Sequence, residues 1–203
     1  MRILCLSIVF VFSVLISTQK QNNPTKPIPQ TDSVLIKLKN KKAAVDQYII
    51  KHGKALIVLV KIPGKTNLLW IKNAHWPDEI EYTYNILKGP SGKIIFIAQI
   101  PYSESGDWDI EYKHYFDEQG NTYAFNKEES IFGDNVKGGV IREILFNYYD
   151  GKFNNINHVN ILTDKDYQLI KRNKNMYNFR DFKYNIYKNL NECLIGYNIQ
   201  LPK

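Results

Sequence analysis

The sequence predicts an α+β fold: one antiparallel meander sheet of about seven or eight strands, covered on one face by an N-terminal helix and C-terminal helices. Two observations carry this prediction. The apolar residues change from helical to strand-like spacing after residue 53, and they return to helical spacing after residue 162. The strand-like runs are short and are separated by turn residues, as in antiparallel hairpins. We therefore expect residues 32–203 to form a single domain.

The first eighteen residues have the pattern of a secretory signal peptide. Arg2 precedes an uncharged, mostly apolar run, Ile3 to Ile16, and the small residues Ser17 and Thr18 follow it. The run is shorter than the roughly 20 apolar residues that a spanning helix needs. The sequence therefore predicts export to the periplasm, the cell envelope or the medium, with cleavage near Thr18. The alternative is an uncleaved leader, which would be the protein's only attachment to a membrane.

Residues 19–31, QKQNNPTKPIPQT, are polar and contain three prolines. This composition predicts a flexible tether before the folded domain. Cleavage of the leader would remove Cys5 and leave Cys193 as the only cysteine. The mature chain would then have no internal disulfide, and Cys193 is interpreted as a buried small hydrophobe.

The formal net charge of +7 is unevenly distributed along the chain. Residues 20–65 carry ten Lys and two Asp, whereas residues 66–164 carry eight basic and fifteen acidic side chains. Only Arg2, Arg142, Arg172 and Arg180 are arginines, and lysine lacks the bidentate fork that reads bases and phosphates. We therefore expect no nucleic-acid partner.

The expected helices and strands follow from the spacing of the apolar residues. Helical spacing predicts a helix over Ser33–His52, which Gly53 would end in the left-handed conformation. Strands are predicted at 55–62, 67–72, 79–87, 93–100, 108–116, 122–126, 140–149 and 152–162, with Asp150-Gly151 as a two-residue hairpin turn. After Thr163 we expect a short helix to about Asn173, an amphipathic helix over Phe179–Leu194 and a final edge strand in LIGYNIQL.

The stretch GDWDIEYKHYFDEQGNTYAF, residues 106–125, holds the most distinctive side chains. Strand alternation places Trp108, Ile110, Tyr112, His114 and Phe116 on one face, and Asp109, Glu111, Lys113 and Tyr115 on the other, polar face. A four-residue loop, 117–120, would set His114 opposite Tyr123 on the aromatic face. The aromatic face is then either a filled core or a pocket with one titratable group. The predicted binding residues are Trp108, Tyr112, His114, Tyr123 and, from a separate loop, Trp76.

Other candidate sites are weaker. His75 lies near Asp78, Glu79 and Glu81, which are metal-ligand types, but their spacing fits no tetrahedral motif and Pro77 implies a turn. We expect no metal and no cofactor, because phosphate loops, nucleophile elbows and paired cysteine motifs are all missing from the sequence.

Three functions remain open at this stage. The first is a non-catalytic exported domain that binds a sugar, a peptide or an envelope protein through the aromatic sheet face or through loops. The second is a secreted hydrolase that uses Asp109 with Glu111, or His114 with a carboxylate. The third is a structural envelope protein.

Overall fold

The computed structural model describes residues 30–73, 75–132, 139–171, 179 and 182–201. The elements in chain order are α1 (Gln30–His52), the 3-10 turn η1 (Gly53–Ala55), β1 (Ile57–Lys61), β2 (Leu69–Trp70), β3 (Tyr82–Lys88), β4 (Ile94–Pro101), β5 (Trp108–Phe116), β6 (Thr122–Phe132), β7 (Val140–Tyr149), β8 (Asn155–Asp164) and α2 (Leu190–Gly196). The predicted α+β meander is confirmed. The predicted leader, and the tether up to residue 29, lie outside the described residues.

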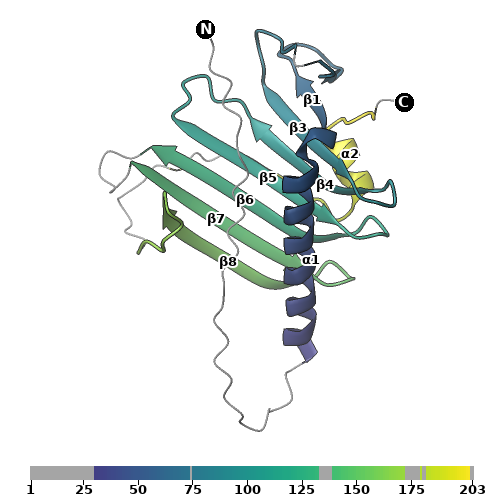
Figure 1. The fold of residues 1–203 in the computed structure, drawn as a ribbon, viewed down its shortest axis with the longest axis vertical. Coiled ribbons are helices and arrows are strands. Elements are labelled where there is room, and N and C mark those ends of the chain that lie inside the picture. The colour runs from purple at the N-terminus through teal and green to yellow at the C-terminus, as the bar shows by residue number, and fades with distance from the viewer. Residues whose placement is uncertain (1–29, 74, 133–138, 172–178, 180–181, 202–203) are drawn as a thin grey trace.

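The strands form one antiparallel sheet in the order β2-β1-β3-β4-β5-β6-β7-β8 (Figure 1). From β3 onward each strand pairs with the next strand in the sequence, as a meander requires. The inner strands form because their β-branched and aromatic side chains are buried on both faces. Ile97 and Ala98 of β4, for example, are adjacent and both buried.

The two helices lie on opposite faces of the sheet, so the prediction that both cover one face is wrong. Tyr115 of β5 packs in a cluster with Val45 and Ile49 of α1. Its neighbour Phe116, which points to the other side, packs with Cys193 of α2. We call these the α1 face and the C-terminal face. The sheet is therefore the middle of three layers.

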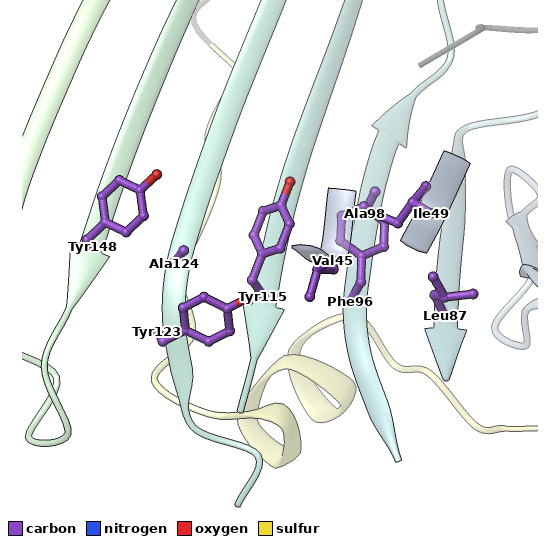
Figure 2. Close-up of a cluster of buried hydrophobic side chains, with 9 residues drawn as sticks. All are labelled: Val45, Ile49, Leu87, Phe96, Ala98, Tyr115, Tyr123, Ala124 and Tyr148. Atoms are coloured by element: carbon purple, nitrogen blue, oxygen red, sulfur yellow. The ribbon is translucent and has the colours of Figure 1, made fainter. Parts of the chain in front are cut away.

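Helix α1 crosses the front of the sheet in Figure 1. Val45 and Ile49, one turn apart on the helix, pack over Phe96, Ala98 and Leu87, as Figure 2 shows. His52 is followed by the 3-10 turn η1. Gly53 is not among the glycines with positive φ, so the expected left-handed end is not formed. The helix position is thus set by packing on β3 and β4.

The C-terminal face is covered by residues 182–201, which are helical only in α2. Asn189 begins this helix, and its side chain accepts a hydrogen bond from the Glu192 amide at 2.9 Å. The predicted helix over Phe179–Leu194 is wrong for residues 182–189, and the predicted helix after Thr163 is wrong, because Thr163 lies in β8. LIGYNIQL contains the end of α2 and no strand.

Three turns share one five-residue design. In the first, Asp117 accepts hydrogen bonds from the backbone amides of Gln119 and Asn121. Asp150 does the same in residues 150–154, and Asp164 does so in residues 164–168. The fourth residues of the three turns, Gly120, Phe153 and Tyr167, have positive φ. The predicted four-residue loop at 117–120 and the predicted two-residue turn at Asp150-Gly151 are therefore both one type of longer turn.

Candidate functional site

The predicted aromatic site is a filled core. His114 is completely buried, and Tyr112 is 1% exposed. The rings of Phe125, Tyr187 and Tyr197 lie within 4.9 to 6.1 Å of the His114 ring, measured between centroids. The prediction that His114 faces an aromatic interior is confirmed. A ligand could reach His114 or Tyr112 only if the C-terminal segment moved away.

His114 is held by one hydrogen bond, which the backbone amide of Tyr187 donates to Nε2 at 3.2 Å. Because Nε2 accepts this bond, the proton of the neutral ring lies on Nδ1. Nδ1 is buried and has no hydrogen-bond partner among the described residues. Burial lowers the pKa of His114 to about 3. The imidazole is therefore neutral and enclosed at physiological pH.

Tyr123 does not lie beside His114, contrary to the prediction. The pairing of β5 with β6 shifts between Tyr115 and Phe116, which leaves Tyr123 as the extra residue of a bulge. Tyr123 packs in the α1-face cluster instead, and Phe125 takes the place opposite His114. The longer turn and the bulge each add one residue. Together they shift β6 by two residues, and because side chains alternate with a period of two, Phe125 still shares a face with His114 as predicted.

Trp108 and Trp76 lie outside the buried core. Trp108 packs on Phe182 with ring centroids 5.2 Å apart, and both line a groove of about 900 Å³ at the end of the C-terminal face. The groove also contains the acidic residues Asp78, Glu79, Glu81 and Glu104. Trp76 lies in the loop before β3 and is 41% exposed. Both tryptophans are accessible, and their binding role stays a prediction.

A second groove, of about 880 Å³, lies on the α1 face between α1 and the sheet. We call it the α1 groove. Its wall is mainly apolar and includes Leu56, Phe96, Ala98, Ile144, Phe146 and Ile161. Lining residues come from β3 to β8 and from the turn after β8. The groove was not predicted from the sequence, because it depends on where α1 crosses the sheet.

Glu111, Lys113 and Glu128 form a row of charges in this groove. The Lys113 ammonium pairs with the Glu111 carboxylate, and it donates to Glu128 Oε2 at 3.2 Å. Their side chains are only 11 to 23% exposed. The two carboxylates outweigh the effect of burial and raise the pKa of Lys113, whereas the cations around Glu128 lower its pKa despite burial. The sequence predicts a polar face at this position, and the structure shows that its charges form a largely buried ion-pair network.

Lys42 and Asp46 of α1 form a second ion pair, at 2.8 Å, beside this row. Asp46 also accepts a hydrogen bond from the Tyr115 hydroxyl at 2.9 Å, and the Lys42 ammonium lies 4.7 Å from the centre of the Tyr115 ring. Burial lowers the pKa of Lys42, while Asp46 opposes that shift. The pair fixes the charged side of α1 against the sheet.

Asp109 points to the α1 face, one step along β5 from Glu111 on the same side. Desolvation and the neighbouring Glu111 carboxylate raise the pKa of Asp109 to about 6, although the side chain itself is exposed. Asp109 and Glu111 therefore lie on the opposite face from His114, as predicted.

The turn after β8 closes one end of the α1 groove. Tyr167 has a φ of 59°, in the left-handed region, and the Arg142 guanidinium lies over its ring, 4.5 Å from the ring centre. Arg142 Nη1 donates to the Asp164 carbonyl at 2.9 Å. Thr163, which pairs with Arg142 across β7 and β8, is 2% exposed, and its hydroxyl has no hydrogen-bond partner among the described residues. A buried, unpartnered hydroxyl thus lines this end of the groove.

No group of three or more potential metal ligands occurs among the described residues, and His75 with its acidic neighbours forms no such group. Neither α1 nor α2 has the length and hydrophobicity that a membrane crossing needs.

No protein-family model, no curated protein and no solved structure matches this chain.

Proposed function

We propose that this protein is an exported, non-catalytic domain that binds a ligand in the α1 groove. One observation carries the proposal: a groove of about 880 Å³ has a mainly apolar wall and a few converging polar groups. Ligand sites in proteins typically have volumes of roughly 300 to 1,000 Å³ and this composition. Export is proposed from the leader pattern of residues 1–18.

The electrostatics of the groove favour binding over catalysis. A general acid or base near neutral pH needs a pKa close to that pH. The pKa of Lys113 is raised and that of Glu128 is lowered, so both remain charged. Because they are paired and charged near neutral pH, these groups are suited to orienting a ligand.

Two alternatives remain. A hydrolase using Asp109 and Glu111 is favoured by the pKa of about 6 at Asp109 beside a lysine-paired carboxylate, which is the asymmetry that glycosidases use. Its other form, with His114, is disfavoured by the complete burial of that ring. Trp108 and Trp76 remain a predicted second surface for a sugar or peptide partner, and a purely structural envelope role would require no ligand.

The proposed function is tested by blocking the α1 groove with a large side chain. Ala43 of α1 is exposed and lines the groove, so Ala43→Trp would fill the groove without changing the core. Ala44→Trp is the matched control, because Ala44 is also exposed but is not among the groove-lining residues. Each protein is purified from the exported fraction without detergent and examined by native mass spectrometry and N-terminal sequencing.

We expect a co-purifying small molecule with the wild type and with Ala44→Trp, and its loss with Ala43→Trp. Equal occupancy in both variants would show that the ligand lies elsewhere. An intact Met1 in protein from the cytosolic fraction would contradict export.

A further inference from the structure

We infer that the ligand of the α1 groove is a neutral amphiphile: a hydrocarbon chain joined to an uncharged head group that carries hydroxyl or carbonyl oxygens. This inference rests on the proposed binding function and adds the chemical class of the ligand. Three features of the groove carry it: its length, the pairing of its charges, and the hydroxyl of Thr163.

The groove is long, which suits a chain. Its lining extends across the sheet from Asn85 of β3 to Thr163 of β8. Six neighbouring strands at a spacing of about 4.8 Å give a span of roughly 24 Å. The apolar side chains Phe96, Phe146 and Ile161 are distributed along this span. A compact sugar ring would leave most of that apolar wall in contact with water.

The buried charges of the groove are paired with each other, whereas Lys39 and Asp166, which also line it, are exposed to solvent. Lys113 pairs with Glu111 and Glu128, and Lys42 pairs with Asp46. The three carboxylates are balanced by these two lysines and by Arg142, whose charge also acts on Glu128. A charged head group in the buried part of the groove would therefore be desolvated without a free counter-ion, which is unfavourable. The groove thus selects against net charge on its ligand.

The hydroxyl of Thr163 is where a head group can form a hydrogen bond in the groove. Thr163 lines the groove, is 2% exposed, and has a hydroxyl without a partner among the described residues. A buried hydroxyl that lacks a partner costs free energy, and a ligand oxygen would remove that cost. Thr163 can donate to a ligand oxygen or accept from a ligand hydroxyl. This places the head group at the β8 end and the chain toward β4.

The test uses three amphiphiles with the same chain and different heads: monolaurin, laurate and dodecylamine, titrated calorimetrically below their micelle concentrations. With the wild type we expect monolaurin to bind at least about tenfold more tightly than either charged amphiphile, which corresponds to about 1.4 kcal/mol. Tighter binding of laurate or dodecylamine to the wild type would overturn the inference.

Two variants locate the head group. Thr163→Val keeps the shape of the side chain and removes the hydroxyl, and should weaken monolaurin about fivefold. Lys113→Met leaves Glu111 and Glu128 without their shared cation, so it should shift the preference toward dodecylamine at least about tenfold. Lys127→Met is the matched control. Lys127 is equally buried and also paired with two carboxylates, Glu129 and Glu143, but it lies on the C-terminal face beside Tyr184.

Thermal unfolding of each variant separates loss of binding from loss of folding. Unchanged head-group preference in folded Lys113→Met, or an equal shift in Lys127→Met, would overturn the inference. If Lys113→Met does not fold, Thr163→Val decides the matter alone. If no amphiphile binds the wild type while Ala43→Trp still removes a native ligand, the amphiphile assignment fails and the proposed binding function stands. If Ala43→Trp removes nothing, both fail.

Discussion

The burial of His114 should make the protein sensitive to acid below pH 6.5. The pKa of this histidine falls from 6.5 to about 3 on folding. Below pH 6.5 the unfolded chain binds a proton that the folded protein does not bind, so stability is lost as the pH falls. The loss is about 1.4 kcal/mol per pH unit, which gives about 2.7 kcal/mol at pH 4.5. A typical domain has a total stability of roughly 5 to 15 kcal/mol, so this loss is substantial.

The perturbation is His114→Gln, which keeps a side-chain acceptor for the Tyr187 amide and does not titrate. Urea unfolding is measured between pH 7.5 and pH 4.5, a range set by the shift of His114. At neutral pH the variant should be less stable, because the packing against Phe125 and Tyr197 is altered. As the pH falls, the wild type should lose stability faster than the variant, and the two curves should converge.

His158→Gln is the control, because it removes an exposed histidine of β8 and leaves His114 in place. It should follow the wild-type pH dependence. Parallel curves for the wild type and His114→Gln would refute the reasoning and would mean that the imidazole can be protonated in the folded protein.

Two further predictions concern Gly196 and Asp109. A Cβ at Gly196 would overlap the Tyr187 ring, so Gly196→Ala should lower the free energy of unfolding by about 1 to 3 kcal/mol, whereas Gly53→Ala, with no atom within 4 Å, should not. Equal urea midpoints for the two variants would contradict this packing. The folded-state pKa of Asp109 is raised to about 6 from 3.8, so its carboxylate costs stability above pH 6, and that cost disappears as the pH falls below 3.8. Asp109→Asn should therefore raise the unfolding midpoint at pH 8 and leave it unchanged near pH 3.5. The rise at pH 8 should be small, because the Asp109 side chain is exposed to solvent. Loss of a measurable glycosidase activity in Asp109→Asn would instead support the hydrolase alternative.

The strands could be predicted because their signals are local. The predicted bounds of two strands agree with β5 (Trp108–Phe116) and β7 (Val140–Tyr149) to the residue, since each is an alternating run bounded by turn residues. The turns were less predictable. An aspartate that binds two later amides forms a five-residue turn, and this design tolerates Phe153 and Tyr167 at positions of positive φ where glycine would be expected.

The C-terminal segment shows why spacing alone can mislead. Phe182 and Ile186 are four residues apart and were assigned to a helix, but with Tyr184 between them they also alternate with a period of two. In the structure Phe182 packs on Trp108 and Tyr184 stacks on Tyr112, as an extended chain on a sheet requires. Periods of two and four coincide over so few residues, so only the tertiary contacts distinguish them.

The candidate site divides in the same way. The face of His114 followed from strand parity, whereas the α1 groove did not, because no local pattern states which face α1 covers. One signal was available: β4 has apolar neighbours such as Ile97 and Ala98 on both sides, which requires a covering layer on each face.

Residues 182–201 follow all the strands in the sequence, and this affects the order in which the fold forms. Six of the seven strand pairs join strands that are neighbours in sequence, and such contacts can form early and quickly. On a sheet formed from these strand pairs alone, the side chains of Tyr112, Phe116 and Phe125 are exposed. They become buried only when residues 182–201, which follow all the strands in the sequence, pack over them. A folding intermediate with the sheet formed but the C-terminal segment undocked would therefore expose an aromatic surface, and intermediates of this kind are prone to aggregate.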